Sequence, residues 1–480
     1  MGYVFSNKRW MFLIDMGKDN LVKKSNRIFR SDKISGFEGN LLFSSIILEV
    51  IKQANQRNRY KFPFYGLSLN LKREKGDEWI REKEYRKVCD KIIADYGRNG
   101  KKYFKKVKRT AICETAFFHK YTLKLIHEIP KMPERRLISE YKQFCKTYAS
   151  YYGLGAITFL FEHILSERLT SPLLARYDNA TEIISQLLES SYKSFMAKSD
   201  ELLLKIKREK NKAKRYILIK KYQQDFFFMK TNYRIAPILT PNVILKMAGK
   251  IGRGRIEKDG SIKRINLKNI RLTEEEKNII ELLKIAEVVR DQRKQLNLTG
   301  SHVLGRFLDE IVRRCRIKKD IASRVFWYEY ENLIKNKTKI VPRLLKRRKV
   351  SIVLEKNKTF YFGRVAIVEN VRLKAVKEIK GTPASKGVVT GRSRIVLSSK
   401  NFGSFKTGEI LIAEMTRPDF LPIMKKASAI ITDEGGLTCH AAIVARELGI
   451  PCIVGTKIAT RIIKNGQKIE VNGNKGIIKL

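Results

Sequence analysis

The chain has 480 residues, of which 43% are hydrophobic, and carries 100 Lys and Arg against 48 Asp and Glu, a formal net charge of +52 at pH 7. This length allows two to four domains, and this hydrophobic content supplies buried cores, so the composition excludes a wholly disordered protein. No secretory signal pattern and no uncharged apolar run of membrane-spanning length is present, so we expect a cytoplasmic protein without a membrane span.

The excess of basic residues is typical of proteins that contact polyanions such as nucleic acid or acidic partners. A lysine-rich proteome is the alternative explanation. The densest runs are "YGRNGKKYFKKVKRT" (96–110) and "KIGRGRIEKDGSIKRINLKN" (250–269), which either contact phosphates or are solvated faces and loops. The six cysteines form no C-x-x-C pair, so we expect no metal site and no disulfide framework.

The first 375 residues are expected to be mostly helical, because apolar residues recur there at three- and four-residue spacing. Candidate helices cover residues 40–56, 180–222 and 271–296. In the last of these, Thr273 is a candidate N-cap, and Glu276 three residues later completes a capping box. The apolar stripe of this helix is then Ile279, Leu282, Leu283, Ala286 and Val289.

The composition changes near residue 375 to short β-branched runs separated by glycine turns. We expect strands within 387–397, 409–415, 428–434, 451–456 and 467–480, and helices within 417–427 and 439–449. Asn472, Gly473 and Asn474 indicate a hairpin near the end. The predicted fold class is therefore α+β and multidomain, with a mostly helical, basic N-terminal region followed by a C-terminal domain of strands and helices.

The most informative stretch is "TDEGGLTCHAAIVARELGIPCIVG", residues 432–455, where a histidine follows a strand and a glycine turn. A helix is expected to start near Thr438 and to stop at Gly449, which places His440 in its first turn. Helix N-termini attract phosphate, and a neutral imidazole is a nucleophile near pH 7. This arrangement suits a phosphohistidine intermediate, and the alternative is a histidine that only caps the helix or fills a pocket.

The segment "GGLTCHAAIVARELGIPCIVG" resembles the histidine motif of the phosphoenolpyruvate-utilising enzymes, which include phosphoenolpyruvate synthase, pyruvate phosphate dikinase and the rifampicin phosphotransferases. The resemblance extends to "GTPASKGVVTGRSRIV", "GEILIAEMTRPDFLPIMKKASAIITDEGG" and "VNGNKGIIKL". It implies a swivelling β/β/α domain that carries a phosphoryl group on His440. By the same resemblance, the phosphate-supporting residues are Thr438, Gly435, Gly436 and, in the upstream T-x-P loop, Thr416.

In this family the histidine needs a donor site and an acceptor site. The resemblance implies ATP or phosphoenolpyruvate as donor, with Mg²⁺ accompanying a nucleotide. No segment before residue 376 resembles an ATP-grasp domain, so we expect a separate ATP-grasp partner chain. The order of a helical domain followed by the swivelling domain resembles the rifampicin phosphotransferases.

We therefore expect a basic, mainly helical region of unassigned role at 1–250, a helical domain and linker that is a candidate acceptor-binding region at 251–375, and the phosphohistidine swivelling domain at 376–480. The expected function is a phosphotransferase component. The alternatives are a nucleic-acid-associated binding or regulatory protein with a non-catalytic swivelling domain, and a divergent kinase that is active alone.

Overall fold

The computed structural model describes most of the chain. The described residues are 10–11, 28–29, 32–38, 41–61, 66–70, 75–80, 82–177, 179–231, 236–251, 266–325, 327–346, 351–354, 360–363, 377–397, 399–416, 420–436 and 439–480. They divide into two compact units. Unit 1 comprises Met1–Phe161, Tyr192–Gly249 and Ile285–Asn370, and unit 2 comprises Glu162–Ser191, Lys250–Lys284 and Val371–Leu480.

Unit 1 contains a five-stranded antiparallel sheet in the order β3-β5-β4-β6-β7. Its strands are β3 (Asp32–Glu38), β4 (Gly66–Asn70), β5 (Lys75–Ile80), β6 (Ser351–Leu354) and β7 (Phe360–Gly363), and a separate pair is formed by β1 (Trp10–Met11) and β2 (Ile28–Phe29). None of these strands was predicted from the sequence. Because β4 pairs with β6 from nearly three hundred residues further along the chain, a local pattern does not reveal the sheet.

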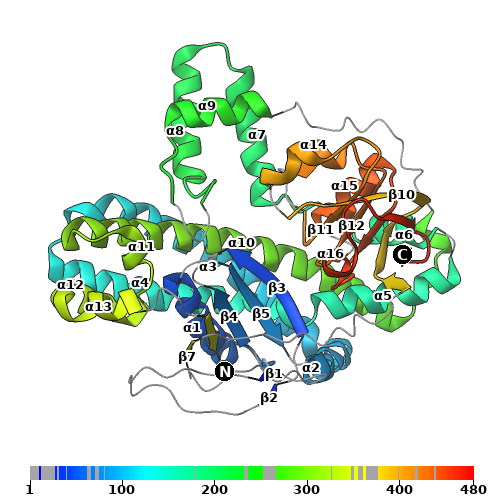
Figure 1. The fold of residues 1–480 in the computed structure, drawn as a ribbon, viewed down its shortest axis with the longest axis horizontal. Helices are drawn as coiled ribbons and strands as arrows, with labels where there is room; N and C mark the ends of the chain where they lie inside the picture. Colours follow the sequence, from blue (N-terminus) through cyan, green and yellow to red (C-terminus); the bar gives the residue numbers. More distant parts are fainter. Residues whose placement is uncertain are drawn as a thin grey trace. The chain divides into compact units, whose positions relative to one another are not determined.

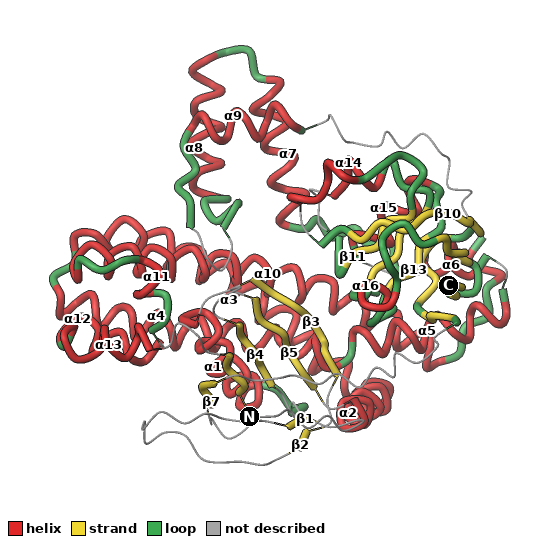
Figure 2. Tube along the Cα trace, in the orientation of Figure 1, coloured by secondary structure: helices red, strands yellow, loops and turns green. Residues whose placement is uncertain are grey.

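Most other described residues of unit 1 are helical. Its helices are α1 (Leu41–Arg57), α2 (Glu82–Asp95), α3 (Lys101–Glu128), α4 (Glu134–Gly155), α7 (Phe195–Arg208), α8 (Lys212–Asp225), α9 (Pro241–Lys250), α11 (Lys319–Ala322), α12 (Tyr330–Lys335) and α13 (Lys337–Lys346). Shorter turns of helix are η1 (Tyr96–Gly100), η2 (Ile129–Lys131), η3 (Ala156–Leu160) and η5 (Trp327–Glu329). Figure 2 shows how strongly helices dominate this part of the chain.

Buried aromatic rings form much of the core of unit 1. Phe118 stacks on Phe144 with ring centroids 5.8 Å apart, and Tyr141 stacks on Tyr330 at 3.7 Å. Helices α1 and α4 approach closely at Gly153, where a Cβ atom would lie 2.8 Å from the backbone nitrogen of Ala54. The apolar spacing in the sequence therefore produces a packed helical core, with a glycine where these two helices meet.

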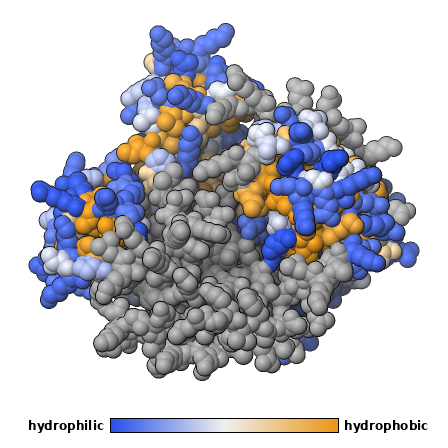
Figure 3. All heavy atoms as spheres, in the orientation of Figure 1, coloured by the Kyte–Doolittle hydropathy of each residue, from blue (hydrophilic) through white to orange (hydrophobic). Residues whose placement is uncertain are grey.

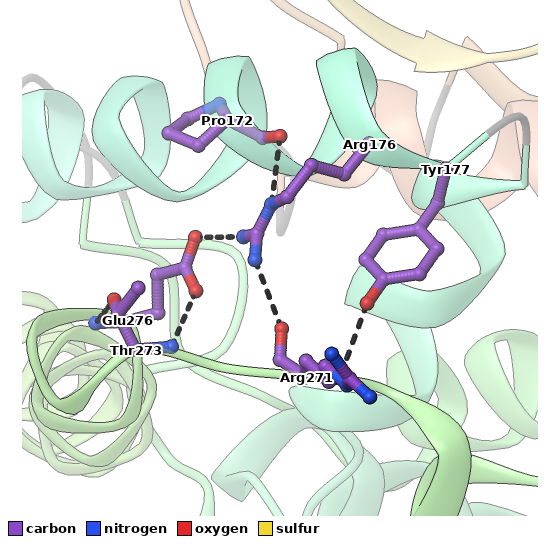
Figure 4. A network of polar contacts seen from close by, with 6 residues as sticks. All are labelled: Pro172, Arg176, Tyr177, Arg271, Thr273 and Glu276. Atoms are coloured by element: carbon purple, nitrogen blue, oxygen red, sulfur yellow. Dashed lines mark hydrogen bonds and ion pairs between the residues drawn. The ribbon is translucent and has the colours of Figure 1, made fainter.

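The 42-residue helix α10 (Glu274–Cys315) begins in unit 2 and continues into unit 1. Its N-terminus is the predicted capping box: the Thr273 N–H donates to Glu276 Oε2 at 2.8 Å, and the Glu276 N–H donates to Thr273 Oγ1 at 3.2 Å. Arg176 of α5 (Glu162–Arg176) also bonds Glu276 (Figure 4). The predicted apolar stripe is buried at all five positions, Ile279, Leu282, Leu283, Ala286 and Val289.

The C-terminal part of unit 2 contains an eight-stranded sheet in the order β8-β15-β14-β10-β11-β12-β13-β9. Figure 1 labels its strands β10, β11 and β12. The strands are β8 (Glu378–Lys380), β9 (Thr382–Ser385), β10 (Val388–Ile395), β11 (Ile410–Ala413), β12 (Ala429–Thr432), β13 (Cys452–Val454), β14 (Lys468–Asn472) and β15 (Ile477–Lys479). Neighbours from β10 to β13 are parallel, and the other pairs are antiparallel. The predicted hairpin joins β14 to β15.

The helical elements of unit 2 are α5, α6 (Ala180–Leu187), η4 (Leu267–Asn269), η7 (Ser399–Ser404), α14 (Leu421–Met424), α15 (His440–Leu448) and α16 (Ala459–Ile462). The sheet buries a cluster on one face that includes Ile412, Ile431 and Ile453 together with Ala459 and Ile463. Helix α15 contacts β9, β12 and β13. A mostly helical region followed by a C-terminal sheet domain confirms the predicted α+β class. Among the described residues, no helix has an apolar stretch long enough to cross a membrane.

Candidate active site

The candidate site begins where strand β12 ends. All four residues of β12, Ala429–Thr432, are buried, and the strand pairs on both sides with parallel neighbours. The carboxyl ends of parallel strands meet at one edge of the sheet, where open α/β sheets commonly bind ligands. The loop that follows β12 therefore starts at this edge and leads directly into α15, whose first residue is His440.

Asp433, the first residue of this loop, is 6% exposed and anchors it. Its Oδ1 atom accepts a hydrogen bond from Thr456 Oγ1 at 2.8 Å, and both of its carboxylate oxygens accept from the Thr460 N–H at 3.3 Å. The Thr460 hydroxyl also donates to Oδ2. Burial raises the pKa of Asp433, although the donors from Thr460 and Thr456 oppose this effect.

The glycine turn after Asp433 requires glycine at its first position. Gly435 has a φ of +116°, a backbone conformation that residues with a side chain rarely adopt. A Cβ atom at this position would also lie 2.8 Å from Cys439 Sγ. Gly436 accepts a hydrogen bond at its carbonyl from the Cys439 N–H at 2.9 Å. A Cβ atom on Gly436 would lie 3.4 Å from Ser166 Oγ, within the same unit. Gly435 is thus the position in this turn that requires glycine.

Helix α15 has Cys439 at its N-cap, in the extended conformation, and the cysteine side chain makes no capping hydrogen bond. The first turn contains no acidic residue. Helix N-termini carry backbone N–H groups and a partial positive charge, and both stabilise a phosphate. At the other end, Gly449 adopts a left-handed conformation with a φ of 65°, which confirms the predicted stop.

The loop after β11 lies beside the loop after β12. The Asp433 N–H donates to the carbonyl of Ala413 at 3.1 Å, and the Glu434 N–H donates to that of Glu414 at 2.8 Å. Thr416, which is buried, follows two residues later. The sheet therefore brings the Thr416 loop and the glycine turn to one edge.

Of the site residues predicted from the sequence, Gly435 and Gly436 lie in the loop after β12, and His440 is the first residue of α15. Thr438 lies outside the described residues, and Thr416 belongs to the neighbouring loop. The carboxylate of Asp433, with Thr456 and Thr460, was not predicted as an anchor. The sequence did contain a signal for this anchor. Asp433 directly follows the buried strand β12, and Thr456 lies two residues after the next strand, β13.

No group of three His, Cys, Asp or Glu side chains in the described part of the chain is arranged to hold a metal ion. The carboxylates nearest the glycine turn in sequence are those of Glu434 and Asp433. The Asp433 carboxylate accepts hydrogen bonds from threonine side chains. The described side chains of this loop therefore form no metal-binding group, and the Asp433 carboxylate serves as an anchor of the loop.

Comparisons with known proteins concern this same domain. Residues 405–476 match the family model described as PEP-utilising enzyme, mobile domain. A probable phosphoenolpyruvate synthase of Archaeoglobus fulgidus is 51% identical over 100 residues, which are 21% of this chain and 13% of that protein. A probable phosphoenolpyruvate synthase of Staphylothermus marinus is 52% identical over 102 residues, or 21% of this chain and 12% of that protein. The phosphoenolpyruvate synthase of Pyrococcus furiosus is 50% identical over 100 residues, which are 21% of this chain and 12% of that protein.

These matches span only about an eighth of the relatives' length. A solution structure of Enzyme I, determined by NMR, is 16% identical and covers 66% of this chain and 80% of its own, with a TM-score of 0.17. A score this low supports no structural conclusion. The matched segment includes positions 416, 435, 436, 438 and 440. In sequence, the C-terminal domain of this chain is therefore similar to the mobile domain of the PEP-utilising enzymes.

Proposed function

We propose that the chain is a phosphotransferase component that carries a phosphoryl group on His440 between a donor site and an acceptor site. The observation that carries this proposal is the mobile-domain match over residues 405–476, which contains a histidine as the first residue of α15. The glycine turn and the adjacent loop after β11 support it, because they border the end of the helix where a phosphate is stabilised.

The chemistry follows from the imidazole. A ring nitrogen of neutral His440 attacks phosphorus, an N–P bond forms, and the P–O bond to the donor's leaving group breaks. The helix N-terminus, the glycine backbone and the proposed partners Thr438 and Thr416 stabilise the transferred oxygens. In the second step an acceptor oxygen attacks phosphorus, and the N–P bond breaks. The imidazole that is freed takes up the proton that the acceptor hydroxyl loses.

The remaining assignments are part of the same proposal. Residues 376–480 are the swivelling carrier, and 251–375 supply the acceptor side. ATP or phosphoenolpyruvate is the donor, and the ATP site, with its Mg²⁺, lies on a separate ATP-grasp chain. The relatives' printed name, phosphoenolpyruvate synthase, supports phosphoenolpyruvate as a reactant of the family. The class of acceptor is left to experiment.

The test is incubation of the full chain with ATP and Mg²⁺ or with phosphoenolpyruvate, each with and without a candidate ATP-grasp chain. Mass spectrometry then maps acid-labile phosphate. We expect phosphate on His440 in wild type, none in His440→Ala, and unchanged labelling in His127→Ala, a control histidine that is exposed on α3. If no donor labels His440 and His440→Ala is silent in every assay, the domain is non-catalytic, and the alternative of a binding or regulatory protein holds.

A further inference from the structure

Helix α8 of unit 1 has an unusual exposed face. Only Ile219 and Tyr222 of this helix are buried. The exposed positions carry four lysines, two large apolar or aromatic side chains and no carboxylate; they are Lys212, Ala213, Lys214, Tyr216, Ile217, Lys220, Lys221 and Gln224. A solvated helix normally exposes charges of both signs and hides its rings. This face therefore combines positive charge with exposed hydrophobic surface.

The exposed ring and the lysines lie together. Tyr216 is 53% exposed and Ile217 is 65% exposed, and the ammonium group of Lys220 lies 5.4 Å from the centre of the Tyr216 ring. Lys212, Tyr216 and Lys220 are four residues apart in sequence, so they form one row along the helix, with about 6 Å of rise per step. The row thus alternates a cation, an aromatic ring and a cation.

The positive charge continues into the preceding turn. Helix α7 ends with Lys205, Lys207 and Arg208, and Lys210 follows before α8 begins. Figure 3 shows hydrophilic side chains gathered at this end of α7–α9, with hydrophobic ones beside them. The face is therefore part of a larger basic surface at the α7–α8 turn.

Several basic residues elsewhere in the unit have carboxylate partners. Lys142 pairs with Glu331, and Arg313 and Arg314 both pair with Glu310. On α8, Lys221 pairs with Asp225. Within the described residues, Lys212, Lys214 and Lys220 take part in no ion pair, so their charge is available to an external anion.

We propose that the exposed face of α8 binds single-stranded nucleic acid, with lysines on the phosphates and a base stacked on Tyr216. Proteins bind single strands with a positive surface that follows the backbone and aromatic rings that stack the bases. An acidic polypeptide would use the lysines, but it has no need of an exposed ring among them. The aromatic ring in the lysine row therefore favours a nucleic acid over an acidic protein.

The test uses fluorescence anisotropy of the full chain with a labelled 20-nucleotide single-stranded oligouridine. The triple variant Lys212→Gln, Lys214→Gln, Lys220→Gln is compared with Lys102→Gln, Lys105→Gln, Lys106→Gln on α3, which removes the same charge from another exposed basic helix. We expect the α8 variant to lower affinity at least ten-fold and to reduce the slope of log K against log salt by about 2, since each phosphate contact on a single strand contributes about 0.7. The α3 variant should change affinity less than three-fold.

Tyr216 separates base stacking from charge alone. We expect Tyr216→Ala to weaken binding about five-fold or more and Tyr216→Phe to leave it within two-fold, because phenylalanine keeps the stacking ring. Equal losses from the α8 and α3 variants, an unchanged affinity in Tyr216→Ala, or equal competition by polyglutamate would each overturn the proposal. Far-ultraviolet circular dichroism of each variant verifies that the fold is intact.

Discussion

At the residue scale, Asp433 holds the glycine turn in place. Its carboxylate accepts from Thr456 and Thr460, so Asp433→Ala removes the acceptor of the Thr460 N–H and hydroxyl and one of the two acceptors of the Thr456 hydroxyl. We expect this substitution to lower the free energy of unfolding by about 1–3 kcal/mol, measured by urea denaturation. Lys464→Ala, at an exposed position of the same domain, should change it by no more than about 0.5 kcal/mol. Equal stability of the two variants would contradict the anchoring role.

Glu409, just before β11, provides a pH-dependent test. It forms a bidentate ion pair with Arg394 of β10, with Nη2 and Oε1 2.6 Å apart, and hydrogen bonds from Arg394 lower the pKa of Glu409 below its ordinary value of 4.5. A carboxylate with a lowered folded-state pKa stabilises the fold above its unfolded pKa and loses that contribution as the pH falls through the folded value.

We therefore expect Glu409→Gln to cost about 1–3 kcal/mol at pH 7 and progressively less below pH 4.5, measured by urea denaturation across pH. The control is Glu378→Gln, at an exposed position on β8. A cost for Glu409→Gln that does not change with pH would rule out the ion pair as its source.

At the scale of the element, the capping box defines the start of α10. Thr273→Ala removes the acceptor for the Glu276 N–H, and we expect it to lower the free energy of unfolding by about 1 kcal/mol. Thr273→Ser keeps the hydroxyl and should be nearly neutral. Chemical denaturation followed by circular dichroism compares the two variants, and similar losses from both would show that the cap contributes little.

At the scale of the whole molecule, the proposed boundary at residue 376 can be tested by truncation. The buried cluster from Ile379 to Ile478 is built entirely from residues of the C-terminal sheet and its helices. A core of this kind is sufficient for independent folding in a domain of about a hundred residues. We expect a fragment 376–480 to unfold cooperatively in urea, and a broad, non-cooperative transition would show that the domain needs segments from 162–191 or 250–284.

The two halves of the chain differed in how much their sequence revealed. In the C-terminal domain, short runs of β-branched residues between glycine turns predicted the strands β10 to β15. The apolar run after the glycine turn predicted α15, and Gly449 predicted its end. The strands β8, with the sequence EIK, and β9, with the sequence TPAS, were missed because neither contains a run of β-branched residues. The candidate helix at 180–222 proved to be three helices, α6, α7 and α8.

By itself, the sequence determined the α+β class, the capping box at Thr273 and Glu276, and the position of His440 at a helix start after a glycine turn. These features depend on residues within a few positions of one another, so local propensity and hydrogen bonding decide them. Only the tertiary structure brought Asp433 to Thr456 and Thr460, paired β4 with β6, and left a basic face with an exposed tyrosine on α8. Such arrangements depend on strands and helices distant in sequence, and burial and pairing between them are settled only when the chain packs.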